Sequence, residues 1–201
     1  MKRKHLGKDK GMLNVVITNL GAYNEGELRG KWFDLEDYDS FDDLEESDEL
    51  KSIGIGESRW DGTEYEEWFV TDFETDIPWI SYEEYPGVKT FDEWCESATL
   101  WADMPEHVRR ILHAYDRHEG INDLAAAEEV VRKERDGEIF LHANCDKEDV
   151  MRRWYDEGVI FCGLGDEERE EMYNFIDWGY VADAYGQELS EVGGDVLEIR
   201  W

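Results

Sequence analysis

Residues 12–20 read MLNVVITNL, a β-branched and apolar stretch that is typical of a buried β-strand. A turn between two glycines follows it and leads into LRGKWFDL at residues 28–35, which we predict as a second strand. Ser40 is placed to cap a short helix over SFDDLEESDEL, and EYEEWFVTDF at residues 64–73 predicts a third strand. Together these segments predict a small α+β domain of residues 11–80.

The middle of the chain has the apolar spacing of helices. Between Phe91 and Trp101, apolar side chains recur at i, i+3, i+4 and i+7, and Thr90 with Glu93 forms a candidate capping box where this helix would begin. Two further short helices with tight turns follow, which is the pattern of a small helical bundle. We therefore predict a central helical domain of residues 81–137.

The last third of the chain mixes strand and helix patterns. EIFLHA at residues 138–143 predicts a strand, Asp146 opens a helix, and two apolar runs around Gly193 and Gly194 predict a closing hairpin. These elements predict a C-terminal α+β domain of residues 138–201. The expected fold class is α+β, an elongated chain of three small domains: α+β, a small helical bundle, and α+β.

The net charge is −31, from 52 Asp and Glu against 21 Lys and Arg. Acidic chains that stay unfolded are poor in aromatic residues, whereas this chain has 9 Trp, 10 Tyr and 8 Phe, which we expect to anchor hydrophobic cores. Spreading like charges along a rod lowers their mutual repulsion, so the charge favours an elongated shape. The first ten residues are basic instead, and we predict a disordered basic leader over residues 1–10.

Sequence patterns for catalysis, cofactors and metals are missing. No Ser/His/Asp or Cys/His arrangement follows from spacing, the histidines form no HExxH, and the glycine pairs lack the rest of a phosphate loop. We therefore expect no enzyme activity, no cofactor and no metal site. Cys95, Cys145 and Cys162 form no CxxC, which fits a reducing cytosol, and no apolar run approaches ~18 residues. These features predict a cytoplasmic protein without membrane contact.

Three interpretations of the acidity are open from composition. Ordinary solvated acidic faces rarely reach a net charge of −31. Halophilic adaptation makes proteins acidic and poor in lysine, and nine Lys against twelve Arg does not exclude it. A folded polyanion can also occupy the basic surface that a DNA-binding protein offers to DNA. Composition leaves DNA mimicry and halophily comparable, and an acidic binding module for another basic protein is a further alternative.

Three segments resemble the antirestriction protein ArdA family, in the family's order. Residues 17–35 (ITNLGAYNEGELRGKWFDL) resemble its opening strand followed by Y-N-x-G-x-L-x-G-x-W. Residues 67–74 (EWFVTDFE) are similar to its E-W-x-I-x-D-Y-E strand, and residues 173–185 (YNFIDWGYVADAY) to its Y-x-x-Y-I-D-Y segment.

The resemblance implies a non-enzymatic inhibitor of type I restriction–modification enzymes, carried by mobile genetic elements or phages. Such an inhibitor occupies the DNA-binding cleft formed by the specificity and methyltransferase subunits, and it does not itself bind nucleic acid. The family's form is an elongated, curved homodimer of three-domain chains joined through the C-terminal domain.

We expect the partner to contact a distributed acidic surface. Acids at i, i+3 and i+4 on a helix stand about 5–6 Å apart at their Cβ atoms, close to the scale of phosphate spacing in DNA. Asp42, Glu45, Glu46 and Glu49 would form one such row, and Glu167, Glu170 and Glu171 another. The predicted partner-binding acids are Asp42, Asp43, Glu45, Glu46, Glu49, Glu66, Asp72, Glu74, Glu167, Glu170, Glu171, Asp177 and Asp183.

Overall fold

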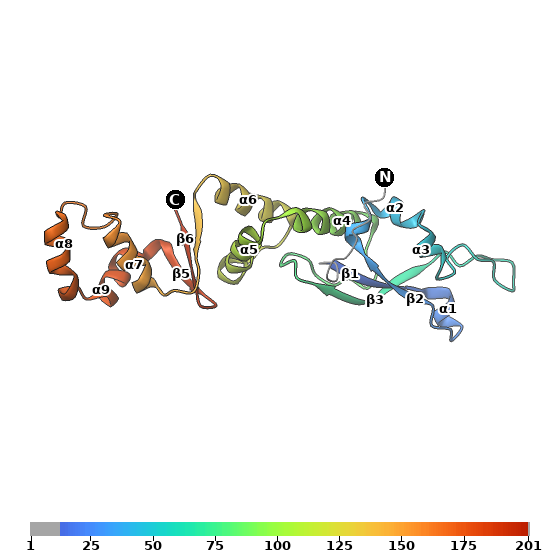
Figure 1. The fold of residues 1–201 in the computed structure, drawn as a ribbon. Coiled ribbons are helices and arrows are strands. Elements are labelled where there is room, and N and C mark those ends of the chain that lie inside the picture. Colours follow the sequence, from blue (N-terminus) through green and yellow to red (C-terminus); the bar gives the residue numbers. More distant parts are fainter. Residues whose placement is uncertain (1–12, 201) are drawn as a thin grey trace. The chain divides into compact units, whose positions relative to one another are not determined.

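The computed structural model describes residues 13–200 (Figure 1), and the predicted basic leader, residues 1–10, lies outside them. The chain divides into two compact units. The first contains the residues up to Met104 together with Asn122–Leu124, and the second contains Pro105–Ile121 and the chain from Ala125 onward. This division does not confirm three domains, because the helices expected to form the central bundle are shared between the two units.

The first unit combines helices with a three-stranded antiparallel sheet. Its elements are β1 (Leu13–Asn19), α1 (Leu20–Asn24), β2 (Gly30–Asp34), a 3₁₀ turn (Leu35–Asp37), α2 (Phe41–Glu45), α3 (Asp48–Lys51), β3 (Trp68–Thr75) and α4 (Val88–Asp103). The strand order is β2-β1-β3, so β1 lies in the centre with an antiparallel neighbour on each side. The strands predicted at residues 12–20 and 28–35 are confirmed, and the third begins a few residues later than predicted.

Period-two alternation along β1 positions the core of this unit. Leu13, Val15 and Ile17 are fully buried, whereas Asn14 and Val16 between them are only partly covered. The ladder between β1 and β3 shifts register between Val16 and Ile17. Because one strand contributes three buried β-branched or leucine side chains, the apolar pattern of the sequence is sufficient to place β1 in the interior.

Helix α4 contributes the aromatic part of the same core. Its predicted inward face is buried throughout, and consists of Phe91, Trp94, Cys95, Ala98 and Trp101. Phe91 packs edge-to-face on Trp68 of β3, with ring centroids 5.8 Å apart. The predicted capping box of Thr90 and Glu93 is wrong. The Phe91 amide already donates to the Gly87 carbonyl (3.0 Å), so the helix begins before Thr90 and Gly87 is its N-cap.

The helix predicted over residues 40–50 is two short helices. Ser40 caps α2 as predicted, with its Oγ accepting from the Asp43 amide at 3.3 Å. The buried Ser47 then acts as a second N-cap, because its Oγ accepts from the Leu50 amide at 3.1 Å and α3 begins at the next residue. The chain therefore changes direction in the middle of the predicted helix.

The second unit is built on another three-stranded antiparallel sheet. Its elements are α5 (Glu106–Glu119), α6 (Leu124–Arg135), β4 (Ile139–His142), α7 (Lys147–Asp156), α8 (Asp166–Met172), a 3₁₀ turn (Tyr173–Phe175), α9 (Trp178–Tyr185), a 3₁₀ turn (Gly186–Glu188), β5 (Leu189–Val192) and β6 (Asp195–Ile199). The strand order is β4-β6-β5. The predicted hairpin is confirmed, and Gly193 and Gly194 take the positive φ values of 61° and 90° that its two-residue turn requires.

Helices α7 and α9 share a core with this sheet. Asp146 caps α7 through a capping box with Asp149, which confirms the predicted start of the helix. Tyr155 of α7 stacks edge-to-face on Trp178 of α9 at 5.4 Å, and both rings are buried. Val196 of β6 belongs to the same cluster, so the aromatic pair ties the helices to the central strand.

Within residues 13–200, no helix combines the length and apolarity needed to cross a membrane.

The central strand β6 also carries a buried carboxylate. Glu198 is 1% exposed and accepts hydrogen bonds from a ring nitrogen of His142 on β4 (2.7 Å) and from Arg200. Burial alone raises the pKa of Glu198, but the hydrogen bonds from His142 and Arg200 outweigh it and hold the pKa below its ordinary value. The ionised form of Glu198 therefore stabilises the folded sheet.

We predict that Glu198→Gln lowers the free energy of unfolding at pH 7 by about 1–3 kcal/mol, because the charged acceptor is replaced by a neutral one. A lowered folded-state pKa means that this stabilisation is complete above the unfolded-state pKa and is lost as the pH falls through the folded-state value. Urea unfolding at pH 7 and pH 3 measures the difference. Glu191→Gln, at an exposed position on β5, is the control. An equal loss at both pH values for Glu198→Gln contradicts the assignment.

Candidate functional site

The predicted partner-binding acids lie on the surface. All are exposed except Glu49, which is half-buried. The exposed ones are Asp42, Asp43, Glu45, Glu46, Glu66, Asp72, Glu74, Glu167, Glu170, Glu171, Asp177 and Asp183. Their carboxylates are therefore accessible to another molecule.

The row predicted from Asp42 to Glu49 is not one helical row. Asp42 and Glu45 are on α2, and Glu46 is the residue at which that helix ends. Glu49 is on α3, which begins anew after the Ser47 cap, so the spacing of i, i+3 and i+4 does not apply across the break. The prediction of a single array is wrong here, and the acids of this segment belong to two short helices.

The row on α8 has the predicted arrangement. Glu167, Glu170 and Glu171 lie within one helix, none of whose residues is buried. Acids in the first turn favour a helix through its dipole, and Glu168 also accepts a hydrogen bond from the Gly165 amide at 2.9 Å. Glu170 and Glu171 are in the last turn, where negative charge is unfavourable. Helix stability therefore does not explain these two carboxylates.

Two of the predicted acids also have local structural partners. Asp177 caps α9, with its carboxylate accepting from the Tyr180 amide at 3.1 Å. Asp72 accepts from the amide of Phe73 at 2.8 Å. Both are exposed, so each retains lone pairs for a further donor.

Basic side chains neutralise a different set of acids. Arg132 pairs with Glu129 and Asp136, both at 2.7 Å, and Arg152 pairs with Glu148 at 2.7 Å. The hydrogen bond from Arg132 lowers the pKa of Glu129. Leaving Glu49 and Glu74 aside, none of the predicted partner-binding acids forms an ion pair with a Lys, Arg or His that the structure describes. Their charge is uncompensated within the described chain.

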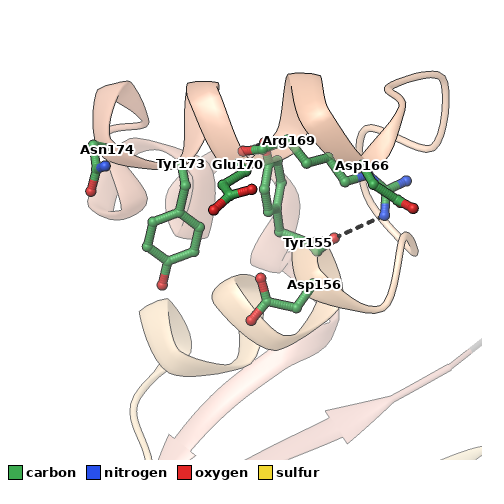
Figure 2. Close-up of a pocket in the computed structure, with 7 residues that line it drawn as sticks. All are labelled: Tyr155, Asp156, Asp166, Arg169, Glu170, Tyr173 and Asn174. Carbon is green, nitrogen blue, oxygen red and sulfur yellow. Dashed lines mark hydrogen bonds between the residues drawn. The ribbon is translucent and has the colours of Figure 1, made fainter.

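A cavity of about 400 Å³ lies between α7 and α8 (Figure 2). The Tyr155 hydroxyl donates to the Arg169 carbonyl at 2.9 Å and Arg169 donates to the Tyr155 carbonyl at 3.4 Å, so these residues join the two helices. Figure 2 shows the carboxylates of Asp156 and Glu170 directed toward the space between the helices. The lining residues are Tyr155, Asp156, Asp166, Arg169, Glu170, Tyr173 and Asn174. Three carboxylates against one guanidinium give the lining of the cavity a net negative charge.

Trp60 is an exposed side chain and a further candidate for contact with a partner. Tryptophans were expected as core anchors, and Trp79, Trp94, Trp101 and Trp178 are indeed buried. Trp60 is 90% exposed, so for this residue the expectation is wrong. The signal that could have indicated it is the Asp61-Gly62 pair directly after it, because Asp-Gly is typical of a tight turn at the surface.

Metal ligands and reactive thiols are not organised into a site in the described chain. No group of three or more His, Cys, Asp and Glu among residues 13–200 is arranged to hold a metal ion. The three cysteines are free, and burial raises the pKa of Cys95 to about 12, which leaves it a neutral thiol.

Comparison with models of known protein families gives a match. The model of the family described as antirestriction protein (ArdA) matches residues 15–197, nearly the whole chain. None of the curated proteins matches the chain.

Proposed function

The chain belongs to the ArdA family of antirestriction proteins, and we propose that it inhibits a type I restriction–modification enzyme by occupying the cleft in which that enzyme binds DNA. The protein acts as a non-enzymatic mimic of DNA. The observation that carries this proposal is the set of exposed carboxylates without basic partners on α2 and α8.

The physical basis is that an enzyme positions DNA largely through its phosphates. B-DNA carries one negative charge per ~1.7 Å of its axis, and the Lys and Arg side chains of its binding cleft are arranged for that density. Contacts to phosphate fix orientation but carry no sequence information, so a carboxylate at a similar place satisfies them. The same surface repels nucleic acid, and the partner is therefore the specificity and methyltransferase subunits rather than DNA.

The active form is a homodimer joined through residues of about 140–201. Support comes from the exposed large apolar side chains of the second unit, which in the described chain fall between residues 159 and 185: Val159, Phe161, Met172, Phe175, Tyr180 and Tyr185. We predict that sedimentation velocity at micromolar concentration shows a dimer, and that Phe175→Asp combined with Tyr180→Asp shifts it to a monomer. A monomeric wild-type protein contradicts this part of the proposal.

We predict that Glu170→Gln with Glu171→Gln weakens competition with DNA roughly fivefold, because each exposed charge contributes about 0.2–1 kcal/mol. Glu170→Gln alone has about a twofold effect, because half of the free-energy loss of the double variant corresponds to the square root of its fold-change. The measurement is displacement of a labelled target duplex from the methyltransferase form of a type I enzyme. Thermal unfolding confirms that the variants are folded, which is expected because α8 buries no side chain.

The matched control is Glu129→Gln with Glu148→Gln. It removes the same number of charges from the same unit, but both acids are paired with arginines, which keep Asp136 and Asp149 as partners. The control is expected to compete nearly as well as the wild type. Equal losses for the two double variants would mean that only total charge matters. Failure of the wild-type protein to displace DNA from several type I enzymes contradicts the proposed function and favours another basic partner.

A further inference from the structure

Trp60 stands outside every core of the protein. It is 90% exposed, whereas Trp79, Trp94 and Trp101 of the same unit are at least nine-tenths buried. Burying a tryptophan side chain removes about 150–250 Å² of surface from water. An indole that stays in water therefore does not contribute this stabilisation to the folded state. The folded chain gains nothing evident from this side chain, and a role in contact with another molecule accounts for it better.

A short hairpin holds the Trp60 backbone in place. The Gly62 amide donates to the Arg59 carbonyl at 3.1 Å, which closes a four-residue turn with Trp60 and Asp61 at its centre. The Arg59 amide donates to the Thr63 carbonyl at 2.6 Å, and Gly62 has a φ of 86°. The amide and hydroxyl of Thr63 both donate to the Asp61 carboxylate, at 3.0 and 2.7 Å. The ring of Trp60 is therefore presented from a fixed backbone.

Charged contacts brace the base of this hairpin. Arg59 pairs with Glu25 and lies over the ring of Tyr65, 5.1 Å from its centroid. The Tyr65 hydroxyl donates to Glu25 at 2.6 Å, and this bond together with Arg59 lowers the pKa of Glu25. On the other side, Arg29 pairs with Glu57 at 3.0 Å. A braced hairpin loses little conformational entropy when it binds, which favours affinity.

The sequence on both sides of Trp60 is rich in acidic residues. Residues 57–67 (ESRWDGTEYEE) contain five acids and one basic residue, Arg59, which is already paired with Glu25. Asp61 and Glu64 are both exposed close to Trp60 along the hairpin. An exposed bicyclic aromatic ring in an acidic segment has the chemical character of a purine base turned out of a DNA strand, whose flanking groups are phosphates.

We propose that Trp60 enters the pocket in which the methyltransferase subunits hold the base that they modify. Methyltransferases rotate their target nucleotide out of the duplex into a fitted pocket, where it stacks between aromatic and apolar side chains. An indole is close to a purine in size and shape and stacks in the same way. The inference rests on the proposed function, and it adds that the mimic supplies the extrahelical base as well as the phosphates.

The first test compares Trp60→Ala with Leu28→Ala for binding to the methyltransferase form of the enzyme. Leu28 is 79% exposed in the same unit and carries no ring, so it controls for loss of a surface apolar group. Trp60→Ala is expected to weaken binding about tenfold, since base stacking on aromatic side chains has this magnitude, and Leu28→Ala less than about twofold. Trp60→Phe should recover part of the loss. Thermal unfolding of each variant verifies that it is folded.

The second test locates the ring in the complex. A photo-reactive p-benzoylphenylalanine at position 60 is expected to cross-link to the target-base pocket of the methyltransferase subunit. Cross-links confined to other surfaces of the enzyme overturn the inference, as does a Trp60→Ala protein that binds as tightly as the wild type. If wild-type protein competes with DNA while either result is found, this inference fails and the proposed function stands. If the wild type does not compete, the proposed function itself fails.

Discussion

The constraint on which this structure depends is that a chain of net charge −31 must gather enough apolar surface to fold while its carboxylates stay in water. Aromatic side chains meet this constraint because each buries a large area from a single position. Phe91, Trp94 and Trp101 form one such core on α4, and Tyr155 with Trp178 forms another between α7 and α9. Because few positions fill these cores, the predicted partner-binding acids, Glu49 excepted, stay exposed.

Much of the fold could be predicted because local signals and burial agree. The apolar run of β1, the inward face of α4, the start of a helix at Asp146 and the hairpin at Gly193 and Gly194 all follow from pattern and turn chemistry. The break between α2 and α3 could not be predicted in the same way. Ser47 lies there as a buried N-cap. A serine inside an acidic helical pattern does not indicate by itself that it will cap a new helix, because that role depends on tertiary packing.

The candidate site was predictable in composition more than in geometry. The arrangement of the acids on α8 was predicted correctly because the segment forms one uninterrupted helix. Within such a helix, the spacing along the sequence determines which side chains are neighbours. The folded structure determines which carboxylates form ion pairs with arginines and which do not. Arg132 and Arg152 show this, because they pair with Glu129 and Glu148. Trp60 was misjudged for a related reason. Hydrophobicity predicts burial on average, but a turn fixed by Asp61 and Gly62 directs this side chain into solvent.

The central claim is that the enzyme binds these carboxylates in place of phosphates. The salt dependence of the enzyme's affinity for this protein tests the claim most directly. Binding to DNA releases condensed counterions, with a log–log slope near −0.9 for each phosphate neutralised. A folded body spreads its charges more widely than a duplex and condenses fewer counterions. Dissociation constants of one type I enzyme for DNA and for this protein, measured from low to physiological salt, should both rise, and the rise should be shallower for the protein. A protein complex whose affinity does not change with salt would contradict the account.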